Sequence, residues 1–264
     1  MRNPRSDLRS AMILLSVAVL LSGCGSLFRK TSDPEELSAL AEARMVLLTL
    51  GSQNEKLVSF KGIGKIKVWQ NGEKRIDERI AWIGSETAKI SIVVLISGHP
   101  AVKMASDGKW FYYYEARQGE PIYKKTAATD ATLQRIVSVP IKPSDIITLL
   151  AGRTPLREHH VALLHRQSSE TGYVLTLKNR WGGIVENVFL GEDKSQVHRI
   201  EFYNRSGGLI YRARFDEMQN VSGYQVPSKL SVSSEEGISV QLETLKYLAD
   251  VPVSPSMFVL NPPD

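Results

Sequence analysis

The sequence is poor in cysteine: Cys24 is the only one among 264 residues. A disulfide within one molecule is therefore excluded, even in a compartment that would permit one. The histidines offer no obvious metal site either. His159 and His160 are adjacent and would point to opposite faces of an extended segment, and no carboxylate cluster lies near them or His165 at ligand spacing. We expect exposed loop histidines and no metal.

The sequence also has no apolar run long enough to span a bilayer. The longest stretch, Ala11–Leu21, holds about eleven residues, whereas a spanning helix needs roughly 20. Arginines precede this run, and it ends in Leu21-Ser22-Gly23-Cys24, the lipobox pattern of bacterial lipoprotein precursors. We expect residues 1–23 to be a cleaved signal peptide. Cys24 would then carry diacylglycerol and an N-acyl chain, with no other cofactor, and residues 24–36 would form a tether. In many Gram-negative bacteria an acidic residue after the lipidated cysteine favours retention in the inner membrane. Gly25 therefore favours the outer membrane, on its periplasmic face.

The net charge of the sequence is small as well. The formal net charge is +5, and about +3 remains without the signal peptide, which is too little and too scattered to predict a nucleic-acid partner. Catalytic motifs are missing: there is no Gly-x-Ser-x-Gly, and Gly62-Ile63-Gly64 lacks the third glycine and the helix of a dinucleotide loop. Close packing or a strand bend accounts for these two glycines. We expect no enzyme.

What is present is a long series of strand patterns. Asn71-Gly72 is a strong hairpin signal, and alternation is clear in Leu209–Phe215 and Ile238–Leu242. We expect about eleven antiparallel strands, a number that makes an open sheet curl, with helices covering its concave side. Two or three helices are available: one from Asp33-Pro34 to about Gly51 with Leu37, Leu40, Ala41, Arg44, Leu47 and Leu48 on its apolar face, a modest one over Thr129–Val137, and one over Pro143–Gly152. The predicted fold is mainly β (α+β), in one domain over residues 37–264.

The order of these features resembles a known family. After the lipobox and the first helix come the Gly62-x-Gly64 strand, the Asn71-Gly72 hairpin and Trp82. They are followed by Lys89–Ile96 running into Ser97-Gly98-His99-Pro100, by Asp107-Gly108-Lys109-Trp110, by Pro140–Pro143, by Val226–Leu230 and by the Phe258…Pro262 tail. The mature chain thus resembles the LolB-like outer-membrane lipoproteins of the LolA/LolB superfamily. The resemblance implies a curved antiparallel half-barrel with helices over an apolar cavity.

The resemblance also implies a function: to receive an acylated lipoprotein from a LolA-like periplasmic carrier, hold its acyl chains, and release it into the outer membrane. We expect a monomer held on the membrane by its lipid anchor. In LolB-like proteins a loop after the third strand touches the membrane; here that points to Leu95 or Ile96, although this segment lacks the family's proline and could simply finish the strand. Cavity lining is expected from nine apolar residues, each of which could also be ordinary core: Ile66, Val68, Ile80, Trp82, Ile92, Val94, Ile146, Leu149 and Leu150.

Two other functions remain open at this point. The same fold serves as a sensor or interaction module in the anti-sigma regulatory family, and it could also be the scaffold of an accessory lipoprotein in an outer-membrane assembly system. Binding of acyl cargo separates the carrier from both alternatives.

Overall fold

The computed structural model describes residues 34–85, 88–129, 140–167 and 171–263. The predicted signal peptide, Cys24 and the tether up to residue 33 lie outside the described residues, and so does the predicted helix Thr129–Val137 from residue 130 onward. The chain divides into two units, Met1–Ser38 and Ala39–Asp264. The strands and the two pockets described below belong to the second unit.

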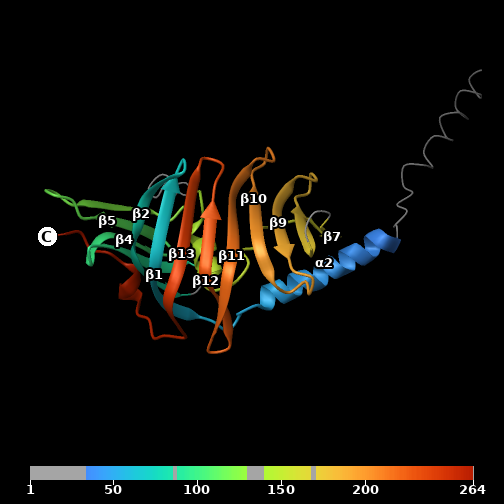
Figure 1. Cartoon of the computed structure of the whole chain (residues 1–264), viewed down its shortest axis with the longest axis horizontal. Helices are drawn as coiled ribbons and strands as arrows, with labels where there is room; N and C mark the ends of the chain where they lie inside the picture. Colours follow the sequence, from blue (N-terminus) through green and yellow to red (C-terminus); the bar gives the residue numbers. More distant parts are fainter. Residues whose placement is uncertain (1–33, 86–87, 130–139, 168–170, 264) are drawn as a thin grey trace, which may run out of the picture. The chain divides into compact units, whose positions relative to one another are not determined.

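A single antiparallel sheet of thirteen strands dominates this unit (Figure 1). Its order is β6-β5-β4-β3-β2-β1-β13-β12-β11-β10-β9-β8-β7, so two meanders meet where the first strand pairs with the last. The strands are β1 Ser59–Gln70, β2 Glu73–Ser85, β3 Lys89–Ile96, β4 His99–Asp107, β5 Trp110–Glu115, β6 Ile122–Ala127, β7 Val161–Arg166, β8 Tyr173–Lys178, β9 Ile184–Leu190, β10 Val197–Tyr203, β11 Leu209–Val221, β12 Tyr224–Ser233 and β13 Ile238–Ala249.

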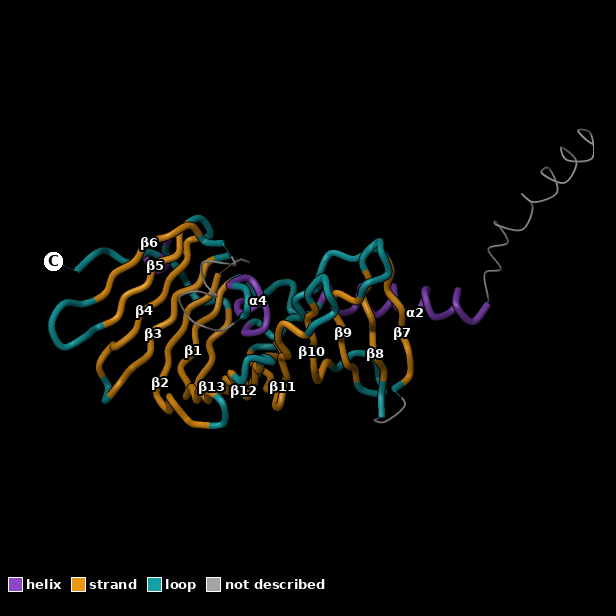
Figure 2. The backbone as a smooth tube through the Cα atoms, turned by 90° about the horizontal axis from the view of Figure 1, so that it is seen from above, coloured by secondary structure: helices purple, strands orange, loops and turns teal. Residues whose placement is uncertain are grey.

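The predicted mainly β architecture is confirmed, but the count of about eleven strands was too low. Residues Ile122–Ala127 form β6, which pairs with β5 from Glu115↔Ile122 to Trp110↔Ala127. Register shifts opposite Ile63/Gly64 and Val68/Trp69 of β1 leave Leu245 of β13 and Arg75 of β2 without a partner on β1. These are bulges in β13 and β2, which bend a strand and increase its twist. Figure 2 shows helix α4 between the two halves of the sheet.

Two α-helices and one 3-10 helix complete the described fold: α2 Pro34–Ser52, α4 Pro143–Leu150 and η1 Pro255–Phe258. Helix α2 begins and ends where the sequence predicts, but it buries another face. Ala43, Val46 and Leu50 are buried, whereas Leu40 and Leu48, expected on the packed face, are 36% and 61% exposed. Apolar side chains lie on several faces of this helix, so the sequence pattern does not determine which face packs against the sheet.

The C-terminal segment covers part of the face opposite α4. It leaves β13 through Asp250, whose N–H donates to the Ser59 carbonyl over 2.8 Å, and η1 then contacts β3 and β4. Phe258 of η1 is buried, and the Tyr123 hydroxyl donates to the Leu260 carbonyl over 2.9 Å. This strap fixes β3–β6, and it leaves the other face of these strands free to line a pocket.

The glycines of the Gly62-x-Gly64 strand serve close packing, as predicted. Gly62 is paired with Trp82 of β2, and a Cβ at Gly62 would overlap the indole ring. A Cβ at Gly64 would overlap the carbonyl of Glu243 in β13. The indole lies over the bare Gly62 backbone, where no side chain would fit.

We therefore predict that Gly62→Val lowers the free energy of unfolding by about 1–3 kcal/mol, because the valine side chain overpacks against Trp82. Chemical denaturation monitored by Trp fluorescence measures this change. The matched control is Gly51→Ala in helix α2, where nothing lies within 4 Å of the added Cβ; it should stabilise the protein by about 0.5–1 kcal/mol. Equal stability of Gly62→Val and the wild type would contradict this account of the packing.

Candidate binding pocket beneath helix α4

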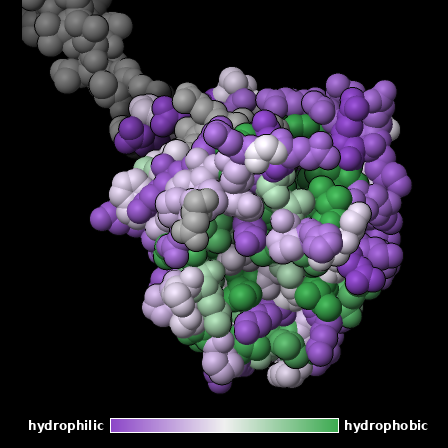
Figure 3. Space-filling view, turned by 90° about the vertical axis from the view of Figure 1, so that its left-hand side faces the viewer, coloured by the Kyte–Doolittle hydropathy of each residue, from purple (hydrophilic) through white to green (hydrophobic). Residues whose placement is uncertain are grey.

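An apolar pocket of about 470 Å³ lies between helix α4 and one half of the sheet. Strands β1–β5 form one wall and β12 and β13 extend it, while Ile141 adds the segment that leads into α4 and Pro143 adds the first residue of that helix. Figure 3 shows the left-hand side of the molecule in Figure 1; hydrophobic residues gather on this face, with hydrophilic residues around them. The lining residues are Ile66, Val68, Arg75, Ile76, Asp77, Glu78, Ile80, Trp82, Ile90, Ile92, Val94, Ile96, Val102, Met104, Phe111, Tyr113, Ile141, Pro143, Ile146, Leu149, Leu150, Leu230, Val232, Val240 and Leu242.

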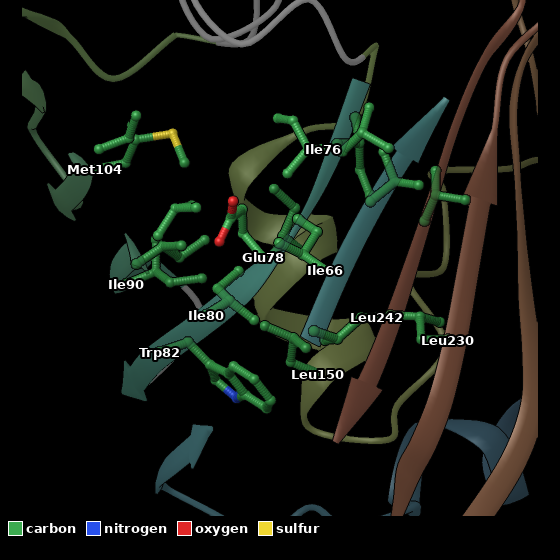
Figure 4. Close-up of a pocket in the computed structure, with 18 of the residues that line it drawn as sticks. Ile66, Ile76, Glu78, Ile80, Trp82, Ile90, Met104, Leu150, Leu230 and Leu242 are labelled. Carbon is green, nitrogen blue, oxygen red and sulfur yellow. The ribbon is translucent and has the colours of Figure 1, made fainter. Parts of the chain in front are cut away.

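Strand alternation builds this surface. Every second residue of a strand faces the same side of the sheet, so β3 contributes Ile90, Ile92, Val94 and Ile96 to the pocket. Many of these side chains are β-branched and have few accessible rotamers, which holds the wall in place. Figure 4 shows Ile66, Ile80, Leu150 and Leu242 converging on the same space from β1, β2, α4 and β13.

Polar contacts hold α4 from the side that faces away from the pocket. Asp145 in the first turn is 2% exposed and accepts hydrogen bonds from both terminal nitrogens of Arg157, at 2.8 and 2.5 Å, and from the Tyr211 hydroxyl at 2.6 Å. The Arg157 guanidinium also stacks 4.2 Å above the Phe202 ring. Burial raises the pKa of the Tyr211 phenol, and the charge of Asp145 adds to this shift.

The other end of α4 is fixed as well. The Tyr247 hydroxyl donates to the Leu150 carbonyl over 3.1 Å, and the Asn54 amide donates to the Ala151 carbonyl over 2.9 Å. Gly152 follows with a φ of +68°, and a Cβ there would overlap the Gln225 carbonyl. The helix end thus requires glycine, as the sequence indicated. Polar groups anchor both ends of α4, while Ile146, Leu149 and Leu150 face the pocket.

Glu186 of β9 is a buried carboxyl group beside this anchor. It is 0% exposed, and its Oε2 accepts a hydrogen bond from the backbone N–H of Arg157 over 2.7 Å. Its Oε1 has no hydrogen-bond partner within the described part of the chain. Burial raises the pKa of Glu186 to about 8. The folded protein therefore keeps a proton on Glu186 at pH values where the unfolded chain has lost it.

This raised pKa predicts a pH-dependent stability. Between about pH 5 and 8 the folded state binds more protons than the unfolded state, so the free energy of unfolding falls as pH rises, by up to about 1.4 kcal/mol per pH unit. Glu186→Gln should abolish this part of the slope, whereas Glu192→Gln on the exposed β9–β10 turn should keep it. Urea denaturation at several pH values measures the difference. A Glu186→Gln slope equal to that of the wild type would contradict the assignment.

The structure places all nine predicted cavity residues on the lining of this pocket: Ile66, Val68, Ile80, Trp82, Ile92, Val94, Ile146, Leu149 and Leu150. Trp82 and Leu149 are nearly or fully buried and serve as core at the same time. The remaining lining residues were not predicted as cavity residues from the sequence. The alternation of β3 could have added Ile90, but Leu230, Val232, Val240 and Leu242 reach the pocket only because β13 pairs with β1.

Leu95 and Ile96 separate onto opposite faces of β3. Ser97 and Gly98, with φ values of 51° and 83°, form a two-residue hairpin turn between β3 and β4. Leu95 and Ile96 therefore complete strand β3 and do not belong to a projecting loop. Ile96 is 49% exposed and lines the pocket, whereas Leu95 is half-buried on the other face. Contact of either residue with a membrane stays a prediction.

Other site types find little support within the described residues. No group of three or more His, Cys, Asp or Glu side chains there could hold a metal ion. His160 and His165 are exposed, but His165 lies in strand β7 instead of a loop, and His159 is half-buried with its Nδ1 2.9 Å from the Arg157 carbonyl oxygen. No helix in the described part of the chain is both long and apolar enough to cross a membrane. A second, more polar pocket of about 490 Å³ lies where Thr49 and Gln53 of the α2 region approach Phe215 and Met218 of β11.

Comparison with known proteins identifies the fold. No family model and no curated protein matches the sequence. A DUF1329 family protein from Desulfovibrio piger ATCC 29098 superposes with a TM-score of 0.59 and 11% identity, over 84% of this chain and 97% of that one. A LolA superfamily protein from Nitrosomonas europaea gives 0.55 and 14%, over 83% and 97%. An outer membrane lipoprotein-sorting protein domain from Vibrio parahaemolyticus gives 0.53 and 11%, over 84% and 97%.

Identities this low show the fold alone. The predicted curved half-barrel of the LolA type is therefore confirmed, with a sheet of thirteen antiparallel strands and α4 over its pocket. The closer resemblance to LolB-like lipoproteins, and any function attached to it, belongs to the proposal that follows.

Proposed function

We propose that this protein is a lipid-anchored carrier of the bacterial envelope that holds acyl chains of lipoproteins or lipids in the pocket beneath α4. The observation that supports this most directly is the pocket itself, which offers about 470 Å³ lined almost entirely by aliphatic and aromatic side chains. An acyl chain gains about 0.8 kcal/mol for each CH₂ moved from water into such surroundings. Binding and release then need only a gradient of affinities, and no nucleotide.

The direction of transfer comes from the lipobox and the fold. Lipid on Cys24 would hold the protein on the periplasmic face of the outer membrane, and a LolA-like periplasmic carrier would deliver the cargo. The similarity to an outer membrane lipoprotein-sorting protein domain supports the same role, as does the LolA superfamily fold. The protein would receive acylated cargo and pass it to the membrane that carries its own anchor.

Filling the pocket should weaken cargo binding. In Ile66→Trp, an indole on the pocket wall displaces two or more methylenes of a bound chain, which costs about 1.6 kcal/mol or roughly a tenfold loss of affinity. The measurement is displacement of a fluorescent fatty acyl probe from a lipid-free form that begins at Ser26 and retains the whole second unit, together with mass spectrometry of co-purified lipid. The matched control is Ile63→Trp on the same strand, because Ile63 is 50% exposed on the opposite face.

If Ile63→Trp weakens binding as much as Ile66→Trp, the loss is not specific to the pocket. If no acyl ligand binds to the wild type, the pocket is merely loosely packed core, and a sensor or assembly role becomes the better account.

Delivery to the membrane should depend on Ile96. This half-exposed residue borders the pocket at the β3–β4 turn, so an apolar side chain there can enter the bilayer surface as cargo leaves. We expect Ile96→Gln to bind cargo like the wild type but to transfer a lipopeptide to liposomes several-fold more slowly, whereas Leu95→Gln on the other face retains the wild-type rate. Equal transfer by all three proteins would show that this turn does not contact the membrane.

A further inference from the structure

The wall of the apolar pocket contains one carboxylate that has no evident structural role. Glu78 of β2 lies between Ile76 and Ile80 on the same face of the strand and opposite Ile66 of β1. Figure 4 shows its carboxylate pointing into the pocket among these isoleucines and Ile90 of β3. Its side chain is only partly exposed, so the charge is set against aliphatic neighbours instead of in open solvent.

The other charged residues of the lining are different, because each has an ion-pair partner along the β1–β2 hairpin. Arg75 lies 2.7 Å from Glu73, and Asp77 lies 2.8 Å from Lys74. The hydrogen bond from Lys74 lowers the pKa of Asp77. No residue within the described ranges forms an ion pair or a hydrogen bond with Glu78. These ranges therefore contain two locally neutralised charges at the pocket and one carboxylate without a counter-charge.

A charged group beside apolar surface is costly unless a partner of opposite sign meets it. Replacing Glu78 by another isoleucine would have completed the aliphatic wall formed by Ile66, Ile76 and Ile80, and the pocket would have bound a plain hydrocarbon chain at least as well. The carboxylate thus adds nothing to the affinity for the chain. The carboxylate of Glu78 favours a ligand whose cationic head lies beside the acyl chain at the pocket wall, and it disfavours a ligand with an anionic head.

We propose that the pocket takes acyl chains whose head carries an ammonium group, and that Glu78 binds this ammonium. The inference rests on the proposed function, since it assigns the chemical class of ligand to the same pocket. Two sources offer this chemistry: the free α-amine of a diacylated N-terminal cysteine, before any N-acylation, and the ethanolamine head of a phospholipid. In both, a primary ammonium is joined to the acyl chains through a glyceryl linker and can donate hydrogen bonds to a carboxylate; in the phospholipid a phosphate lies between the two.

Three ligands with the same dodecyl chain test the charge preference: dodecylammonium, the neutral glycerol monoester of dodecanoic acid, and dodecanoate. Each displaces a fluorescent acyl probe from the form that begins at Ser26, at neutral pH and below its micelle concentration. We expect the wild type to bind the ammonium about tenfold more tightly than the neutral ester, and dodecanoate most weakly. Glu78→Gln should bind all three alike while keeping the affinity for the neutral ester, and Glu78→Lys should reverse the order. Glu217→Gln, which removes an exposed carboxylate of β11 that is paired with Lys229 and lies outside the pocket lining, should behave like the wild type.

The second set of ligands distinguishes the two sources. A diacylated cysteine peptide with a free amine is compared with its N-palmitoylated form, and lysophosphatidylethanolamine with its N-acetylated form. A preference for the free amine in the first pair assigns the ligand to immature lipoproteins; a preference in the second pair assigns it to phospholipids. Either result supports the proposal if Glu78→Gln removes the preference.

The proposal is overturned if the neutral ester binds and the wild type shows no charge preference, or if Glu78→Gln leaves the preference intact. Binding of the neutral ester keeps the proposed carrier function in either case. If no ligand of any charge binds, the pocket does not hold acyl chains at all, and the proposed function and this inference both fail.

Discussion

The pairing of β1 with β13 is the contact that the rest of the structure depends on. It runs from Phe60↔Ala249 to Gln70↔Ile238 and joins strands that are separated by most of the chain. Each meander by itself consists of hairpins between neighbours in sequence, and these hairpins could form without the other meander. Only the β1–β13 ladder places Leu230 and Leu242 beside Ile66, and only this combined wall is wide enough to hold a pocket beneath α4. Because contacts this distant in sequence carry a large loop-closure cost, we expect the ladder to form late in folding.

Helix α4 makes polar interactions on the side that faces away from the pocket and presents apolar side chains on the side that faces it. Desolvation of Asp145 and Arg157 is expensive, and a buried ion pair of this kind adds little to net stability. Its value lies in position: the bidentate pair, the Tyr211 hydroxyl and the Phe202 ring define one place for the first turn of α4. Loose hydrophobic packing alone would let a short eight-residue helix slide over the sheet. With the helix fixed from behind, its apolar residues can face a cavity without having to fill it.

Local features of the fold could be predicted from the sequence because they depend on neighbouring residues. Asn71-Gly72 forms the expected hairpin turn, Pro143 and Gly152 bound α4, and alternation predicted the pocket side of β1–β3. The face of α2 could not be predicted, since a helix apolar on most sides has several stripes that could pack. Ser97-Gly98 was hard to read because serine seldom adopts a positive φ. The proposed role of Glu78 was hidden for a different reason: a glutamate in an alternating strand is expected to face solvent. Glu78 instead shares the pocket face of β2 with Ile76 and Ile80 and lies opposite Ile66.

The openness of the pocket fits a carrier better than a storage protein. An acyl chain gains about 0.8 kcal/mol per CH₂ in any apolar medium, so a fully enclosed cavity would hold the chain about as well as a bilayer does. Here Ile76 and Ile96 remain 38% and 49% exposed at the border of the pocket. The part of a bound acyl chain near these two residues would stay partly hydrated, so its transfer into a membrane would be favourable without an energy source. In the proposed carrier, incomplete burial of the acyl chain would make its release into a membrane favourable, whereas a single charge on the wall would only select which ligands enter. Affinity for the chain and selection of its head group would then come from separate parts of the same surface.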